Sequence, residues 1–444
     1  MDWRQATAAS PPEPPQSTIE QWPASGRAWA TVSILVLLGI ISMLDRQIIN
    51  LMAGAIKADL GLTDLKLSLL QGFSFAIFYA TLGIPLGYAA DRFPRRWVIF
   101  GGMIVWASAA TLSGFATSYG ELLTARIFIG IGEAALAPCA YSMITDLFPA
   151  RRLGRALSVY SYSSSIGGAV AIAIGGMLLD LSDRLTAISF FAGMDTWQIG
   201  FIVTGAPGLI LAFLVFAVRE PVRRGAAKNR IGAWSDVFAF MASRRRFFVC
   251  HFGGFSMLML ICYGMSGWVP IVLMRVFQWG PDSVGIFYAL FIMINSVLAL
   301  TGHGMIVDAM FARGIRDAHL RYFAFGAPLI IIFGLLATQA SSGMIYLLAI
   351  APAFWFINIM GVAAASVQIV TPPQMRGRVS AIFLLVVNLV GLGFGPLVVA
   401  AFTNFVFCDE GKLVWSIAAT MICFAPLAIG ALTWGLGAAR DAVA

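Results

Sequence analysis

Charged residues are scarce in this sequence of 444 residues, where Asp, Glu, Lys and Arg make up 11% and hydrophobic residues 59%. Soluble domains carry about 25% charged residues, so this composition excludes an ordinary soluble protein. The sequence also lacks a Gly-x-x-x-x-Gly-Lys-Ser/Thr run, which argues against ATP as an energy source. His251, His303 and His319 have no second ligand at metal spacing, so we expect no metal site and no cofactor.

Long apolar segments dominate instead, and each is long enough to cross the hydrocarbon core of a bilayer as a helix. We predict an all-α membrane protein with transmembrane helices near residues 28–53, 65–90, 97–118, 121–145, 155–180, 197–218, 247–273, 283–307, 321–340, 343–370, 377–406 and 412–438.

The net charge of +8 reflects topology and not a nucleic-acid partner. With the N-terminus inside, the loops on the cytosolic face hold nineteen basic residues: Arg92, Arg95, Arg96, Arg151, Arg152, Arg155, Arg219, Arg223, Arg224, Lys228, Arg230, Arg244, Arg245, Arg246, Arg313, Arg316, Arg321, Arg376 and Arg378. The other face holds five: Lys57, Lys66, Arg184, Arg275 and Lys412. This bias predicts that both termini are cytosolic.

An internal repeat divides the chain in two. The Gly-x-x-x-Asp pattern at Gly87 and Asp91 recurs at Gly304 and Asp308, and the longest polar loop lies between the two copies. We therefore expect two bundles of six helices, the parts of an alternating-access transporter. The expected divisions are a disordered cytosolic tail at 1–27, a bundle at 28–218, a central cytosolic loop at 219–246 and a second bundle at 247–438.

Four charged residues interrupt the apolar segments: Asp45 and Arg46 in the first, and Arg126 and Glu133 in the fourth. A charge at the centre of a bilayer costs about 3 kcal/mol, so such residues usually face a cavity or a partner and mark a functional pathway. Arg126 and Glu133 are two helical turns apart and project from one face. Asp45 and Arg126 lie at similar depths, so they can pair, either to serve transport or as a static link between helices.

Glu133 is predicted near the middle of the membrane. Burial disfavours its ionised form and nearby Arg126 favours it, so this carboxylate is a candidate for loading and releasing a proton. We expect protonation of Asp45 or Glu133 to free Arg126 for an anionic group of the substrate. The alternative role for Glu133 is a hydrogen-bonded helix contact.

Several motifs resemble the major facilitator superfamily. Gly87-x-x-x-Asp91-Arg92-x-x-Arg95-Arg96 is similar to its signature cytosolic loop, with Pro94 where Gly is usual, and Gly167 to Gly176 is a degraded form of its fifth-helix antiporter motif. Leu44-Asp45-Arg46 together with Arg126-x-x-x-Gly130-x-Gly132-Glu133-Ala134 resembles the spinster branch. That resemblance implies export of sphingosine-1-phosphate or lysophospholipids.

The second half carries no charge within its apolar segments and is rich in Met and aromatic residues. A cavity charged on one side and apolar on the other suits an amphipathic lipid. Polar candidates for its wall are Tyr79, Tyr160, Ser164, Tyr263, Asn295, Asn358 and Asn388. Candidates for an inner, cytosolic gate are Gly87, Asp91, Arg92, Arg95, Arg96, Asp146, Arg152, Arg155 and Asp308.

We therefore predict a monomeric, proton-coupled secondary transporter of an amphipathic lipid, in a bacterial plasma membrane and driven by the proton gradient. One alternative is an exporter of a non-lipid drug or metabolite. Another is a membrane sensor that transports nothing, although the sequence has no soluble output domain. A membrane-embedded enzyme lacks a nucleophile and base at membrane depth.

Overall fold

The computed structural model describes residues 22–443, except 187, 224–233 and 373–374. Among these residues it contains twelve helical segments long and apolar enough to cross a membrane, as the sequence predicted. Most of the predicted tail at 1–27 and part of the predicted central loop lie outside the described residues.

The first six spans run antiparallel along the bundle. They are formed by α1 (Ser25–Asp59), by α2 (Asp64–Ser68) with η1 (Leu69–Phe73) and α3 (Ser74–Arg92), by α4 (Arg95–Ser113), by α5 (Tyr119–Glu133) with α6 (Leu136–Leu147), by α7 (Ala150–Leu185), and by α8 (Thr196–Leu211) with η3 (Ala212–Ala217). A short turn, η2 (Ser189–Phe191), precedes α8.

The remaining six spans follow α9 (Trp234–Ser243). They are formed by α10 (Arg245–Arg275), by α11 (Pro281–Ser283) with η4 (Val284–Tyr288) and α12 (Ala289–Ala312), by α13 (Ala318–Ala337), by α14 (Gly343–Ile357) with α15 (Met360–Val370), by α16 (Arg376–Asn388) with η5 (Leu389–Phe394), α17 (Gly395–Ala401) and η6 (Phe402–Phe407), and by η7 (Glu410–Lys412) with α18 (Leu413–Val443).

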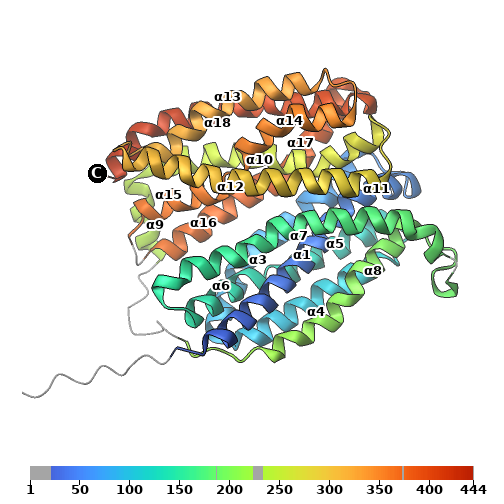
Figure 1. The fold of residues 1–444 in the computed structure, drawn as a ribbon, viewed down its shortest axis with the longest axis horizontal. Helices are drawn as coiled ribbons and strands as arrows, with labels where there is room; N and C mark the ends of the chain where they lie inside the picture. Colours follow the sequence, from blue (N-terminus) through green and yellow to red (C-terminus); the bar gives the residue numbers. More distant parts are fainter. Residues whose placement is uncertain (1–21, 187, 224–233, 373–374, 444) are drawn as a thin grey trace, which may run out of the picture.

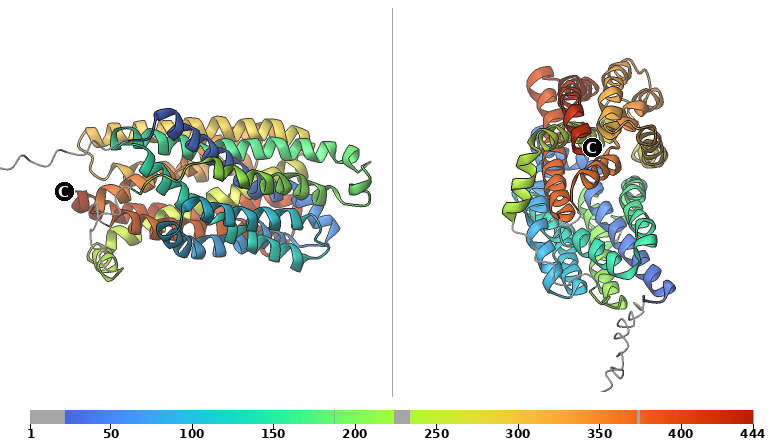
Figure 2. Two further views of the ribbon diagram at one scale, coloured as in Figure 1. Left: turned by 90° about the horizontal axis from the view of Figure 1, so that it is seen from below. Right: turned by 90° about the vertical axis from the view of Figure 1, so that its left-hand side faces the viewer.

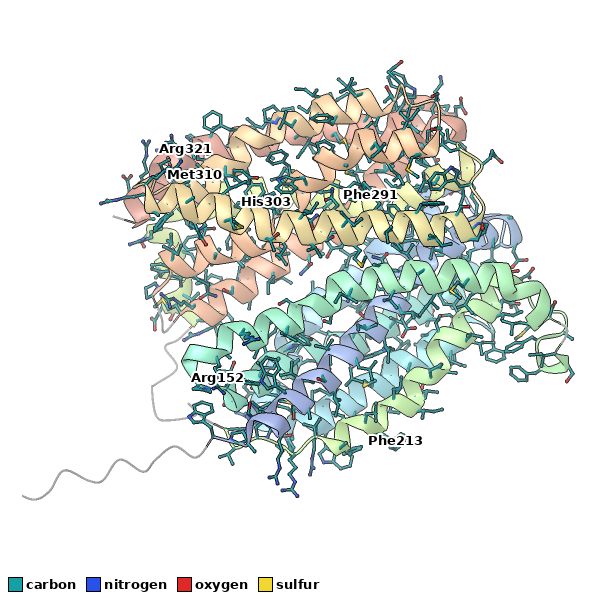
Figure 3. The ribbon with its side chains drawn as sticks, in the orientation of Figure 1. Arg152, Phe213, Phe291, His303, Met310 and Arg321 are labelled. Carbon is teal, nitrogen blue, oxygen red and sulfur yellow. The ribbon has the colours of Figure 1, made fainter. Side chains whose placement is uncertain are left out.

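The two sets of six spans lie side by side, and each keeps to its own side of the molecule in Figures 1 and 2. The start of α1 and the end of α18 lie at the same end of the bundle, which we call the termini side. Figure 3 places Arg152 and Arg321 at this end. We call the opposite end, where α1 ends at Asp59 and α10 ends at Arg275, the far side.

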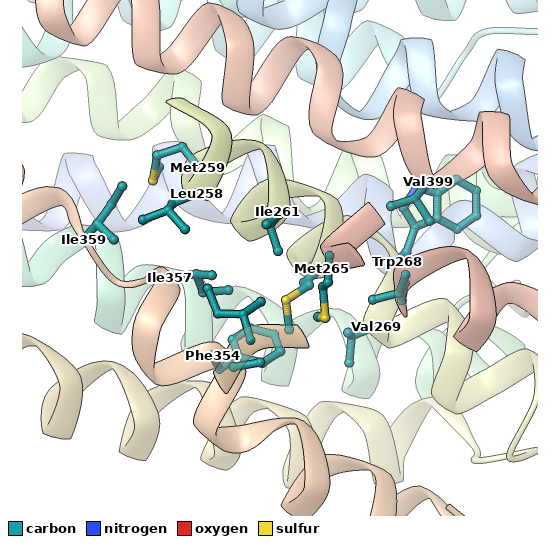
Figure 4. Packing of buried hydrophobic residues seen from close by; sticks show 14 of the residues in the cluster. Leu258, Met259, Ile261, Met265, Trp268, Val269, Phe354, Ile357, Ile359 and Val399 are labelled. Carbon is teal, nitrogen blue, oxygen red and sulfur yellow. The ribbon is translucent and has the colours of Figure 1, made fainter. Parts of the chain in front are cut away.

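The two halves pack against each other mainly at the far side. One cluster of buried apolar residues fills the second half (Figure 4) and continues into the far-side parts of α1, α2 and α8, through Met52, Leu67 and Trp197. Among the described residues, a second cluster, including Val32 and Met143, is formed by buried first-half residues together with Leu392, and Tyr263 of the second half packs against it. The ribbons of the halves diverge toward the termini side (Figure 1). The apolar core is therefore shared between halves at the far side.

Spans four and ten are each broken near their middle. The break in span four follows Glu133, and the break in span ten lies at Asn358 and Ile359. Irregular backbone within membrane helices is tolerated where protein covers it or where it lines a cavity. In span ten, His303 binds the freed carbonyl of Trp355 at 2.8 Å and the Asn358 amide binds that of Phe354 at 3.0 Å. This break is therefore satisfied by protein groups.

Candidate functional site

Asp45 and Arg46 are neighbours on α1 and point toward different partners. Consecutive residues on an α-helix are about 100° apart around its axis, since a turn takes about 3.6 residues. The Asp45 carboxylate accepts a hydrogen bond from Trp106 Nε1 on α4 at 3.2 Å. The Arg46 guanidinium is directed instead at Glu133 on α5 and at two aromatic rings on α3. Two consecutive residues of α1 thus place an acidic and a basic group in separate surroundings.

Arg46 and Glu133 form an ion pair, with Arg46 Nη2 2.5 Å from Glu133 Oε2. The Glu133 side chain is fully buried and that of Arg46 is 14% exposed. The guanidinium lies 4.5 Å from the ring centre of Phe75 and 4.9 Å from that of Tyr79, within range of cation–π attraction. Within this ion pair, the Arg46 side chain is therefore the partly exposed member.

Arg126 contacts Asp45 in a different way from the one expected. Its Nη1 donates to the main-chain carbonyl of Asp45 at 3.3 Å, and its guanidinium lies 5.4 Å from the ring centre of Phe201. Asp45 Oδ1, Arg126 Nη2 and Glu133 Oε1 are buried and make no hydrogen bond with the described residues. The site thus holds two carboxylates and two guanidiniums with unused bonding capacity, a costly arrangement in a low-dielectric interior.

Three contributors to this site were missing from the sequence-based prediction: Phe75, Trp106 and Phe201. All three are buried, at 2%, 0% and 1% exposure. An aromatic residue in an apolar helix carries no sequence signal that separates a partner of a charge from ordinary packing. Only the positions of the charged residues could have drawn attention to their neighbours.

The residues predicted to line the cavity wall form two groups: Tyr79 and Tyr263 have polar or charged side-chain neighbours, and the other described ones make contacts between or within helices. Tyr79 stacks on Phe75 beside Arg46, and Tyr263 OH donates to Asn388 Oδ1 at 3.5 Å in the second half. The others make helix contacts, as Tyr160 packs edge-on against Tyr141, Asn295 donates to the Ala351 carbonyl, and Asn358 donates to the Phe354 carbonyl. The side chain of Ser164 lies outside the described residues.

The sequence predicted that methionine and aromatic residues of the second half line an apolar cavity wall. In the structure these residues are divided between the core and the surface. Phe255, Met259, Met265 and Phe354 are buried in the core of that half, most of them visible in Figure 4. Met293 is 39% exposed on α12. Packing within the second half therefore accounts for the four buried residues.

Three of the predicted gate residues, Arg92, Arg95 and Arg96, contact neighbours within the first half. Arg95 is fully buried, pairs with Asp146, and donates from Nε to Glu220 Oε1 at 2.8 Å. The backbone N–H of Arg96 donates to Glu220 Oε2 at 3.2 Å, and Arg92 stacks on the Tyr88 ring at 4.3 Å. In this conformation Arg95 therefore ties α4 to α6 and to the end of span six, and its bonds do not reach the second half.

The remaining gate candidates lie toward the termini side. Gly87 faces Pro138 of α6, and Arg152 and Arg155 are exposed on α7. Asp308 lies near the end of α12, and the side chain of Asp91 is outside the described residues. The cytosolic gate remains a prediction for all of the gate candidates.

The chain belongs to the Major Facilitator Superfamily, whose family profile matches residues 35–396. It is accordingly a multi-pass membrane protein and a secondary transporter, and not an enzyme. This confirms the superfamily and the all-helical fold of twelve spans predicted from the sequence.

Similar proteins include transporters of different kinds. The chain is 27% identical over 421 residues to an MFS-type efflux pump of Mycolicibacterium smegmatis, covering 93% of each chain. It is 23% identical over 408 residues to protein spinster of Drosophila melanogaster, covering 88% of this chain and 65% of that one. A probable L-galactonate transporter of Escherichia coli is 25% identical over 395 residues, covering 85% of this chain and 84% of that one.

Among solved structures, the fold is similar to that of a bacterial homologue of the human lysosomal transporter spinster, solved in an inward-facing and unoccupied conformation. The TM-score is 0.78 at 23% identity, with 94% of this chain and 98% of that chain covered. A D-xylose–proton symporter has a TM-score of 0.64 at 18% identity, with 90% and 97% covered. These similarities support the fold.

Proposed function

We propose that this protein is a proton-coupled transporter of an amphipathic lipid, such as a lysophospholipid or a sphingosine-1-phosphate-like molecule, working by alternating access. Residues 28–218 and 247–438 act as the two moving bundles, joined by the cytosolic loop 219–246. The termini side faces the cytosol of a bacterial cell, and the protein works as a monomer in the plasma membrane. The proton gradient supplies the energy, without a cofactor.

The observation that carries the proposal is the buried ion pair between Arg46 and Glu133. The pair gains Coulomb energy only while Glu133 is ionised, because a protonated carboxyl no longer offsets the guanidinium charge. Protonation of Glu133 releases Arg46, which is the partly exposed member of the pair. The released cation then holds an anionic group of the substrate, a role first expected of Arg126. Deprotonation restores the pair.

The surroundings of Arg46 favour a ligand with an anionic head and an apolar body. Phe75 and Tyr79 flank the guanidinium with their ring faces. Arginine is well suited to phosphate and carboxylate because its planar fork can donate two parallel hydrogen bonds. The motifs that resemble the spinster branch imply a lipid as the carrier of that head group, and the overall similarity to protein spinster agrees with that resemblance.

Neutralising each carboxylate tests the proton coupling. In proteoliposomes, Asp45→Asn and Glu133→Gln should each abolish uptake of a fluorescent lysophospholipid driven by a proton gradient, because neither variant can exchange a proton at the substituted position. Glu121→Gln is the control, since Glu121 is an exposed acid on the same helix as Glu133 that caps the backbone at Thr117. Full pH-dependent uptake by both variants would contradict the proposal.

The second candidate is export of a non-lipid drug or metabolite, which the similarity to an efflux pump over 93% of the chain favours. Competition experiments separate the two candidates. Under the lipid proposal, sphingosine-1-phosphate displaces a fluorescent lysophospholipid and cationic dyes do not. Displacement by the dyes alone would assign the protein to the second candidate.

A further inference from the structure

Four charged residues join the two halves at the far side. Lys57 at the end of α1 and Asp64 at the start of α2 belong to the first half, and Arg275 at the end of α10 and Glu410 in η7 belong to the second. In the sequence, Lys57 and Arg275 are evidence for topology only, and no pattern marks Asp64 or Glu410 as site residues. Each half contributes one cation and one anion.

Asp64 is the centre of this cluster. Its fully buried carboxylate accepts from Lys57 Nζ at 2.7 Å and from both terminal nitrogens of Arg275, at 2.8 Å and 3.0 Å. The Arg275 contact is a two-pronged bond between halves, a geometry among the strongest ion pairs in proteins. Glu410 is 55% exposed, pairs with Lys57 and lies 3.5 Å from Arg275.

Beneath this cluster the backbones of the halves come into direct contact. Gly72, in a π-helical turn of span two, has no room for a side chain, because an added Cβ would overlap the carbonyl oxygen of Leu392 in span eleven. Next to it, Gln71 Nε2 donates to the Gly267 carbonyl of α10 at 3.4 Å. Closure at the far side therefore depends on a glycine as well as on charge.

We propose that Asp64, with Lys57, Arg275 and Glu410, forms the latch that holds the far side shut, and that Gly72 permits the close approach which brings the latch together. The inference rests on the alternating access proposed above, because only a transporter that opens at both sides in turn needs a reversible closure here. Separation of the halves breaks the Asp64–Arg275 bonds and leaves Lys57 with Asp64, so neither Asp64 nor Lys57 is left unpaired.

Distance measurement across the far side tests the latch without any transport assay. One spin label goes on Lys66→Cys in the first half and the other on native Cys408 in the second, both exposed, after the other four cysteines are replaced. Pulsed electron paramagnetic resonance should show Asp64→Asn gaining a population with a longer distance. The exchange Asp64→Arg with Arg275→Asp should return the distribution toward that of the unaltered latch.

Two further variants keep the test decisive if Asp64→Asn folds poorly. Arg275→Gln changes a partly exposed residue and should open the far side in the same way. Gly72→Ala should also lengthen the distance, whereas Gly83→Ala, in the same span with open space around it, should not.

Unchanged distributions in Asp64→Asn, Arg275→Gln and Gly72→Ala would overturn the latch. That result would leave the proton and lipid assignments standing, since those are measured by uptake. Conversely, if the protein proves not to take up lysophospholipids, the measured distances and their interpretation stay the same.

Discussion

Arg95 shows what a single residue contributes to this fold. Its guanidinium is fully buried, yet its nitrogens bind Ser142, Asp146, Glu220 and the carbonyl of Pro221. A buried charge is tolerated when ion pairs and hydrogen bonds replace the water that it loses. Arg95 therefore joins three spans at the termini side through one side chain.

We expect Arg95→Ala to lower the free energy of unfolding by about 3–5 kcal/mol, because the change removes a buried guanidinium together with its bonds to Ser142, Asp146 and Glu220. Arg92→Ala is the matched control, since Arg92 is exposed and stacks on Tyr88, and should change stability by less than about 0.5 kcal/mol. Thermal unfolding of the two purified variants in detergent makes the comparison. Equal melting temperatures would contradict the account of Arg95.

Sequence reasoning located the charged site but not its pairing. Depth along a helix follows from residue count, and this was enough to bring Asp45, Arg46, Arg126 and Glu133 together. The rotation of each helix about its own axis decides that Arg46 and not Arg126 pairs with Glu133. That rotation depends on packing against helices far away in the sequence. The aromatic partners and the far-side cluster were missed for the same reason.

At the scale of helices, α4 and α5 approach closely where two glycines meet. A Cβ added at Gly132 would lie 2.5 Å from the Gly102 carbonyl oxygen and 2.6 Å from the Trp106 backbone nitrogen. This contact holds α5 against α4 at the residue before Glu133, and so it fixes the position of the carboxylate relative to Trp106 and Asp45. The spacing of the helices therefore sets the geometry of the site.

Gly132→Ala should force these helices apart, and we expect a loss of about 1–3 kcal/mol in stability, as is usual for overpacking, together with reduced uptake. Gly120→Ala lies in the same helix with nothing within 4 Å of the added methyl group, so it should leave uptake unchanged. Unfolding and uptake are measured on both variants. Normal uptake by Gly132→Ala would show that the site does not depend on this contact.

At the scale of the whole molecule, the number and order of spans followed from the sequence because a bilayer requires long apolar helices. The shared far-side core and the latch did not, because contacts between halves depend on conformation and one sequence serves several conformations. The structure shows at which end the halves are joined: they share an apolar core at the far side and have separate cores toward the termini side.

The most direct test of the central claim is binding of a lysophospholipid to the purified protein at acidic and at neutral pH, for the native chain and for Arg46→Ala and Arg126→Ala. If protonation of Glu133 frees Arg46 to hold an anionic head group, the native chain binds more tightly at acidic pH and Arg46→Ala loses both the affinity and its pH dependence. Equal binding by the native chain and Arg46→Ala at both pH values would contradict the account.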